Sequence, residues 1–249
     1  MRVIARLDVK NEHVIKGIHL EGLRKIGNPN HLAQLYYTQG VDEILFMDAV
    51  ASLYDRNNIL SVIESASRDV FVPITVGGGI RKIEDIECAL KAGADKVAIN
   101  TAAVRNIELI TLAAKKYGSQ CIVGSIEAKK NNSGSWEVYI QTGREPTGLD
   151  VIDWAKKLEE AGIGELLVTS VDMEGTRKGF DVNLVSQLHK AVLCPIIVSG
   201  GYGRSLHLTH LLEECCPSAV ALSSVFHYHS QTVKEVKEYL KSQKIEIRL

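Results

Sequence analysis

The chain has 249 residues, 45% hydrophobic and 24% charged, so it can bury one sizeable core and is ordinary in composition for a globular protein. Its 29 lysines and arginines against 30 acids give a net charge of -1, which excludes nucleic acid or an anionic membrane as partners attracted by overall charge. Five cysteines without a C-x-x-C pair, no apolar run of membrane-spanning length and no secretory cleavage signal predict a cytoplasmic protein.

Short apolar segments alternate with amphipathic ones along the whole chain, which is typical of repeated βα units and a parallel sheet. The apolar segments predict strands at 3–9, 43–48, 73–77, 96–100, 121–127, 165–172, 195–199 and 219–223. The amphipathic stretches predict helices, among them 31–39, 83–92, 107–117, 151–161, 183–191 and 232–241. Eight such units without a linker predict an α/β fold, a single (β/α)8 TIM barrel domain over 1–249.

The two halves of the chain repeat the same features about 120 residues apart. Asp8 and Glu127 end the first and fifth predicted strands, and Asp48 and Asp172 end the second and sixth. Glycines follow strands three and seven, and short polar dipeptides end strands four and eight. We therefore predict an internal two-fold repeat of half-barrels, spanning about 1–120 and 121–249.

The strand ends predict two phosphate sites at the mouth of the barrel, where (β/α)8 enzymes place their active sites. The glycines at 77–79 and 199–201 let backbone N–H groups approach an anion closely. The dipeptides at 100–101 and 223–224 open helices whose N-termini favour negative charge. Two matched sets favour a small molecule with two phosphates. The alternative is that these glycines serve only tight βα turns.

Asp8 and Glu127 fall on opposite sides of the predicted mouth, between the two phosphate sites. Paired carboxylates in such a place suit general acid–base chemistry, in which one takes a proton while the other gives one. Alternatively, each acid caps a loop or pairs with a lysine such as Lys16. Asp48 and Asp172 are secondary candidates, either for binding ribose hydroxyls or for ordering their loops.

Two further features of the sequence leave alternatives open. The long segment 129–147, rich in Asn, Ser and Gly, predicts a lid, a small hairpin or an inert insertion. The histidines show no metal-ligand spacing, so we expect neither a metal site nor a cofactor.

Specific motifs near almost every strand resemble the cyclase-subunit family of imidazole glycerol phosphate synthase. They are RLDVKNEHVIKG (6–17), EGLRKIGNP (21–29), VGGGI (76–80), GADKVAINTAAV (93–104), GSQ (118–120), SVDMEGTRKGFD (170–181), SGG (199–201) and SSVFH (223–227). The resemblance runs nearly end to end. It is closer than the resemblance to the sister isomerase of histidine biosynthesis, which lacks the long loop after the first strand.

The resemblance implies that a HisH-like glutaminase at the N-terminal face of the barrel releases ammonia, which crosses the barrel core. Ammonia would then convert a ribulosyl aminoimidazole carboxamide bisphosphate nucleotide to imidazole glycerol phosphate and aminoimidazole carboxamide ribonucleotide. The residues implied as the acid–base pair are Asp8 and Glu127. Those implied in substrate and phosphate binding are Lys16, Gly79, Asn100, Thr101, Gly175, Gly201 and Ser224. The implied ammonia gate is Arg2, Glu43, Lys96 and Glu165, for which a purely structural ring of salt bridges is the alternative.

The chain departs from the family pattern around the mouth, at Arg6 (usually Cys), Asn11-Glu12 (Asp-Gly), Glu127 (Asp), Glu174 (Asp) and Tyr202 (a small residue). The extra methylene of Glu127 moves its carboxylate by more than about 1 Å, which can cost about 100-fold in rate. These departures also resemble a paralogous group that, with a glutaminase partner, supplies ammonia to a sugar amidotransferase of surface-polysaccharide biosynthesis. That role is the alternative function, and an isomerase on the same barrel is the third.

Overall fold

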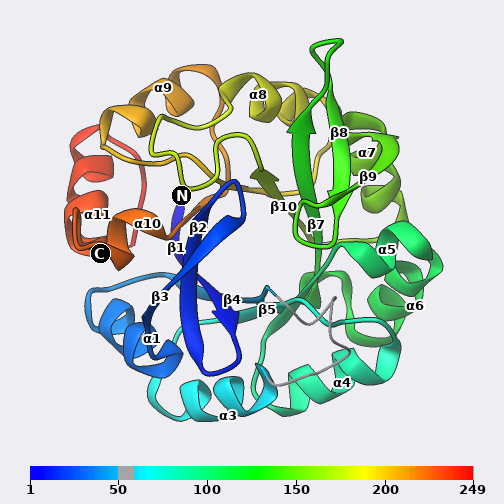
Figure 1. The fold of residues 1–249 in the computed structure, drawn as a ribbon, viewed down its shortest axis with the longest axis horizontal. Coiled ribbons are helices and arrows are strands. Elements are labelled where there is room, and N and C mark those ends of the chain that lie inside the picture. Colours follow the sequence, from blue (N-terminus) through cyan, green and yellow to red (C-terminus); the bar gives the residue numbers. More distant parts are fainter. Residues whose placement is uncertain (50–58, 249) are drawn as a thin grey trace.

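The computed structural model describes residues 1–49 and 59–248, which fold around eight parallel strands closed into a ring (Figure 1). The barrel strands are β1 (Arg2–Lys10), β4 (Glu43–Asp48), β5 (Ile74–Gly77), β6 (Lys96–Ile99), β7 (Ile122–Lys130), β10 (Glu165–Ser170), β11 (Ile196–Ser199) and β12 (Ala219–Leu222). Pairing of β12 with β1, and of β7 with β10, completes the ring. The predicted (β/α)8 barrel is confirmed, with small shifts at the strand ends.

Helices cover the outside of the barrel and connect successive strands (Figure 1). In chain order they are α1 (Pro29–Thr38), α3 (Ile59–Asp69), α4 (Ile83–Lys91), α5 (Thr101–Arg105), α6 (Glu108–Tyr117), α7 (Val151–Ala161), α8 (Val182–Ala191), α9 (Leu206–Glu214), α10 (Ser224–His227) and α11 (Val233–Ser242), with a 3-10 turn at Ser119–Cys121. Within 1–49 and 59–248, no helix has the length and hydropathy that crossing a membrane requires.

Capping moves the start of the first helix away from its predicted position. The helix predicted at 31–39 begins two residues earlier, at Pro29, a residue that fits the first turn of a helix well. Just before it, the Asn28 side chain accepts hydrogen bonds from the backbone N–H groups of Asn30 (2.9 Å) and His31 (3.1 Å). The cap therefore fixes the point where the chain leaves the mouth of the barrel and turns down its outside.

The barrel strands are apolar on both faces, as expected for a parallel sheet covered by helices. Their outward side chains pack against the helices in one large core. Their inward side chains form a second, smaller apolar layer, made of Ile4, Leu45, Ala98, Val123, Leu167, Ile197, Ala219 and Ala221. This lumen layer fills the middle of the barrel and separates polar side chains at the mouth from a ring of charges at the opposite end.

Two antiparallel hairpins extend from the C-terminal ends of β1 and β7 (Figure 1). β2 (His13–Ile18) and β3 (Glu21–Gly27) follow β1, whereas β8 (Trp136–Ile140) and β9 (Glu145–Asp150) follow β7. The segment 129–147 therefore forms most of a hairpin, one of the alternatives that its composition left open. Each hairpin adds backbone and side chains to the rim of the mouth.

A buried ion pair fastens the last helix to the barrel. Lys237 of α11 lies 2.6 Å from Asp42, which precedes β4, and the two side chains are only 4% and 8% exposed. The second Asp42 carboxylate oxygen accepts the backbone N–H of Val3 on β1 at 2.7 Å. One carboxylate thus connects the first strand, the start of the second barrel strand and the final helix.

We predict that Asp42→Ala lowers the free energy of unfolding by about 3 to 5 kcal/mol, because it leaves the buried Lys237 charge unpaired. In a chain of this size, such a loss lowers the melting temperature by roughly 6 to 20 °C. Thermal unfolding followed by circular dichroism measures the shift. The matched control is Lys234→Ala, which removes the exposed partner of Glu238 on the same helix and should leave the melting temperature nearly unchanged. Equal shifts in both variants would contradict the prediction.

Candidate active site at the mouth of the barrel

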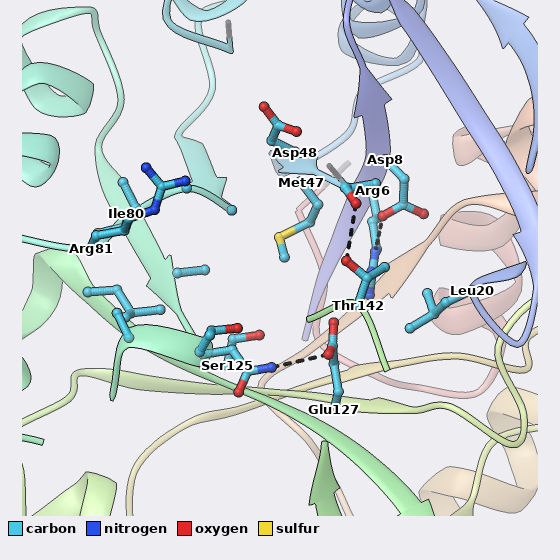
Figure 2. Close-up of a pocket in the computed structure, with 18 of the residues that line it drawn as sticks. Arg6, Asp8, Leu20, Met47, Asp48, Ile80, Arg81, Ser125, Glu127 and Thr142 are labelled. Carbon is cyan, nitrogen blue, oxygen red and sulfur yellow. Dashed lines mark hydrogen bonds and ion pairs between the residues drawn. The ribbon is translucent and has the colours of Figure 1, made fainter. Parts of the chain in front are cut away.

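A pocket lies over the C-terminal ends of the barrel strands (Figure 2). Its walls come from β1, β4, β6 and β7 and from the loop after β5. The hairpins also contribute, because Leu20 and Leu23 of the first and Thr142 of the second line the same cavity. The pocket therefore lies at the strand ends, where the sequence predicts the active site.

Arg6 and Asp8 both face the inside of the barrel, because side chains two residues apart lie on the same side of a strand. The Arg6 Nε donates to Asp8 Oδ1 at 2.8 Å, as Figure 2 shows. Its Nη1 donates to the Thr169 hydroxyl (2.8 Å) and to the Ser199 hydroxyl (3.1 Å). A residue that sequence analysis treated only as a departure from a family pattern is therefore a buried centre of the site, and the two-residue spacing from Asp8 was the signal for it.

Asp8 is held as a carboxylate by two cations. Burial alone would raise its pKa, but the charge and hydrogen bond of Arg6, together with Lys16, outweigh burial and hold the pKa at about 2. Lys16, on β2, lies 3.4 Å from the second Asp8 oxygen and also forms a buried ion pair with Glu174. Both carboxylate oxygens of Asp8 thus have positively charged partners. The pair with Lys16 is the alternative that the sequence left open for this acid.

Glu127, on β7, has the opposite electrostatic character. Burial raises its pKa to about 7, against the lowering effects of the Gly143 N–H group and of the Arg6 charge. Its Oε2 accepts hydrogen bonds from Gly143 N (2.8 Å) and from Asn100 Nδ2 (3.2 Å). Figure 2 shows Glu127 facing the Arg6–Asp8 pair from across the barrel. Of the two acids, Glu127 is the one able to exchange a proton near neutral pH.

The first predicted phosphate site lines the pocket. Gly78 and Gly79 after β5 have left-handed backbones, with φ of 87° and 75°, and a Cβ on Gly78 would lie 2.3 Å from the carbonyl oxygen of Asp48. Only glycine fits there. Asn100 and Thr101 border the same end of the cavity, at the start of α5. These groups form one continuous polar surface at one side of the mouth.

Two arginines that sequence analysis did not single out line the same end of the pocket. Arg81 follows the glycine loop, and Arg105 lies one helical turn after Thr101 on α5. Arginine is the side chain best suited to phosphate, because its planar fork donates two parallel hydrogen bonds. The i, i+4 spacing of Arg105 from Thr101 was a usable signal.

The second predicted phosphate site does not line this pocket, because its glycines pack against other backbone. A Cβ on Gly175 would lie 2.2 Å from the carbonyl oxygen of Gly17 on the first hairpin, and the His19 N–H donates to the Glu174 carbonyl at 2.8 Å. Gly201 accepts a hydrogen bond from the backbone of a neighbouring loop. The first hairpin therefore lies against the loop after β10 and covers that part of the predicted site.

The remaining predicted residues of this half also make local contacts. Ser224 is buried at the start of α10, and Asp172 Oδ2 accepts the backbone N–H of Lys130 at 2.7 Å, which orders its loop. The Tyr202 hydroxyl donates to the Gln231 side chain at 2.8 Å. The structure thus brings together the residues of the first predicted phosphate site, Lys16 and both acids, and leaves the second predicted set outside the cavity.

The four residues of the predicted ammonia gate form a closed ring of ion pairs at the N-terminal end of the barrel. Arg2 contacts Glu43 at 2.8 Å and pairs with Glu165. Lys96 lies 2.9 Å from a carboxylate oxygen of each of these glutamates. The ring sits directly below the apolar lumen layer, because Arg2 and Ile4 share the inner face of β1. Its geometry fits a gate and a structural ring equally.

The chain is similar in sequence to known proteins of histidine biosynthesis. Residues 2–232 match the sequence profile of the family described as "Histidine biosynthesis protein". A Legionella pneumophila protein named imidazole glycerol phosphate synthase subunit HisF is 57% identical over 204 residues, covering 82% of this chain and 96% of that protein. A protein of the same name from Bacillus cereus (strain Q1) is 44% identical over 248 residues, covering 100% of this chain and 98% of that protein.

The raised pKa of Glu127 predicts a pH-dependent contribution to stability. In the unfolded chain the carboxyl group titrates near 4.5, and in the folded chain at about 7. The stabilising effect of the bound proton is therefore complete below the lower value and is lost as the pH rises through the upper one. Between about pH 5 and about pH 8, the wild-type chain should lose stability relative to Glu127→Gln, as measured by urea unfolding.

Glu160→Gln, at an exposed carboxylate on α7, is the control for this comparison and should follow the wild type at each pH. A constant difference in unfolding free energy between the wild type and Glu127→Gln across the range would contradict the prediction.

Proposed function

The chain belongs to the histidine biosynthesis protein family and, within it, to the HisF cyclase subunits of imidazole glycerol phosphate synthase, and on this premise we propose how its pocket performs the reaction. The substrate is the ribulosyl aminoimidazole carboxamide nucleotide with a phosphate at each end, and ammonia is the second reactant. The lyase-type reaction yields imidazole glycerol phosphate and aminoimidazole carboxamide ribonucleotide. The observation that carries this proposal is the pair of opposed acids, Asp8 and Glu127, beside a phosphate site.

The two acids have different tasks in this proposal. Asp8 stays ionised and stabilises positive charge that develops as the ammonia nitrogen bonds to the substrate. Glu127 takes and returns the protons that ring closure and cleavage require, because its pKa of about 7 matches the working pH. Lys16, fixed between Asp8 and Glu174, contributes to the positive side of the site. The two acids are therefore not equivalent in this proposal: Asp8 stays charged, and Glu127 exchanges protons.

The polar end of the pocket binds one phosphate of the nucleotide. The loop at Gly78 and Gly79, the start of α5 and the arginines Arg81 and Arg105 supply donors and positive charge there. Binding the second phosphate at Gly175, Gly201 and Ser224 requires the first hairpin to separate from Gly175. The proposal therefore includes an outward movement of this hairpin when the full nucleotide binds.

We predict that the purified chain forms imidazole glycerol phosphate from the bisphosphate nucleotide and ammonium salt without a partner protein. Glu127→Gln should lower kcat by about 10²- to 10⁴-fold, because it removes the titrating group. Glu127→Asp should keep the activity or raise it, since it retains the acid. Chromatographic detection of the product measures all three chains, with Glu160→Gln as the control. Absence of product at every ammonium concentration would contradict the proposed reaction.

We also propose that a glutaminase supplies the ammonia from the N-terminal face of the barrel. Two apolar side chains project into solvent from loops that enter strands at this face, Phe71 (74% exposed) before β5 and Leu193 (98% exposed) before β11. Exposed apolar residues at a rim of charges are typical of a protein interface. The ring of Arg2, Glu43 and their partners lies at the centre of the same face, where ammonia would enter the lumen.

Replacing the two apolar residues tests this face. Phe71→Asp combined with Leu193→Asp should weaken glutaminase binding at least about 10-fold, a loss expected when interface anchors are removed, while activity with free ammonium is retained. Isothermal titration calorimetry with the partner measures the binding. Leu112→Asp, at an apolar residue exposed on α6 on the side of the barrel, is the matched control. Equal effects of both changes would place the interface elsewhere.

A second candidate function is ammonia supply to a sugar amidotransferase in surface-polysaccharide biosynthesis. The observation that favours it is the mouth itself, where Arg6 occupies the position usually held by cysteine and the second phosphate site is packed against the first hairpin. A chain with this role would bind a glutaminase at the same face but would not cyclise the nucleotide. Turnover with ammonium salt separates the two functions.

We place either function in the cytoplasm. The cysteines Cys88, Cys121, Cys194, Cys215 and Cys216 are free thiols in the structure. Free thiols persist in a reducing compartment, where disulfides are rare.

A further inference from the structure

We propose that the Arg6 side chain is a gate that closes the barrel lumen toward the pocket. The inference rests on the proposed function, because it concerns the passage of glutaminase-derived ammonia through the lumen. In the conformation described here, ammonia that enters from the N-terminal face cannot reach the acids until the Arg6 guanidinium leaves its hydroxyl partners.

The order of side chains along β1 locates the gate. Residues two apart on a strand face the same side, so Arg2, Ile4, Arg6 and Asp8 follow one another up the inside of the barrel. Arg2 belongs to the charged ring and Ile4 to the apolar lumen layer. Arg6 therefore lies between that layer and Asp8, on the route between the two ends of the barrel.

The Arg6 side chain crosses the lumen instead of lying along its own strand. It starts on β1 and bonds to Thr169 on β10 and to Ser199 on β11, strands separated from β1 by β12 in the ring. Thr169 and Ser199 are register partners on neighbouring strands, so their hydroxyls form one docking point for the guanidinium. The side chain thus covers the part of the lumen that β10, β11, β12 and β1 enclose.

The opposite part of the lumen is filled from β4, β6 and β7. Met47, Ala98 and Ser125 line the floor of the pocket together with Arg6. Met47 also packs against the lumen layer, and a Cβ on Gly77 would lie only 2.5 Å from its sulfur. Apolar packing on one side and a hydrogen-bonded guanidinium on the other make up the floor, and of these residues Arg6 has the longest side chain.

The bonds of Arg6 make the gate stable when closed. The Arg6 side chain is 4% exposed. Its guanidinium stays charged at every physiological pH and would lose its ion pair or its hydroxyl partners on moving. Removing one partner from a buried ion pair is strongly unfavourable. Opening is therefore expected only when other groups, such as those of a bound anionic substrate, replace Thr169 and Ser199 as acceptors.

The test compares two sources of nitrogen in the complete complex with a glutaminase. One assay supplies ammonium salt, and the other supplies glutamine together with an enzyme that consumes ammonia released to bulk solvent. The share of glutamine nitrogen that reaches imidazole glycerol phosphate, per glutamate formed, then reports passage through the lumen. The ammonium assay includes the same cyclisation step without passage through the lumen, so it measures separately any effect of a variant on the chemistry alone.

We expect Arg6→Cys, which removes the cross-lumen side chain, to raise this share several-fold over the wild type, toward one product per glutamate. Arg6→Lys is the matched control, because it keeps a long, positively charged side chain in the lumen that can still donate to the Thr169 and Ser199 hydroxyls. It should leave the share near the wild-type value. If Arg6→Cys does not fold, Thr169→Ala with Ser199→Ala removes the docking point and should raise the share in the same direction.

Three results would overturn the inference. They are a wild-type share already equal to that of Arg6→Cys, equal increases in Arg6→Cys and Arg6→Lys, and no increase in the Thr169→Ala, Ser199→Ala chain. Each would show that Arg6 does not obstruct the route. Failure of the ammonium assay in the wild type is a different outcome, because it would overturn the proposed cyclase function and with it the inference built on it.

Discussion

The pairing of the buried Arg6 charge organises the mouth of this barrel. A guanidinium removed from water must find anionic or acceptor groups, since an unpaired buried charge costs on the order of several kcal/mol. Arg6 takes Asp8 as its ion-pair partner and two hydroxyls as acceptors, and Asp8 in turn draws in Lys16, which binds Glu174. Within the described residues, this chain of alternating charges places no cation in direct contact with Glu127. The two acids differ in strength because the charges of Arg6 and Lys16 outweigh burial at Asp8, whereas burial dominates at Glu127.

The same network explains why the two predicted half-barrels present unlike surfaces. Both halves carry a hairpin after their first strand and glycines after their third, so the backbone plan is repeated. The side chains that hold the two hairpins in place differ between the halves. Lys16 and Glu174 draw the first hairpin onto the loop after β10, whereas the second hairpin meets the mouth through Thr142 and Gly143. The two predicted anion sites therefore differ, because one lines the pocket and the other is covered by the first hairpin.

The sequence predicted the eight strands, the barrel and the position of Asp8, Glu127 and the loop at Gly78 and Gly79 at its mouth, because these depend on apolar periodicity and on glycine at fixed places. It did not predict the packing of Gly175 against Gly17, since a contact between segments about 158 residues apart leaves no local pattern. The sequence also did not predict the pKa difference between the two acids, because this difference depends on the burial and the charged neighbours of each carboxylate in three dimensions. The role of Arg6 could have been predicted, because its spacing from Asp8 already placed both side chains on one face of a strand.

The tip of the second hairpin influences the pKa of Glu127. Gln141, Thr142 and Gly143 adopt left-handed backbone conformations in succession, and this turn aims one N–H group at Glu127 and another at the Thr101 hydroxyl. The strength of the acid on β7 is thus set partly by a loop about fifteen residues further along the chain. Evolution or protein engineering can therefore change the pKa of Glu127 by remodelling a surface turn, while every residue of the barrel wall stays as it is.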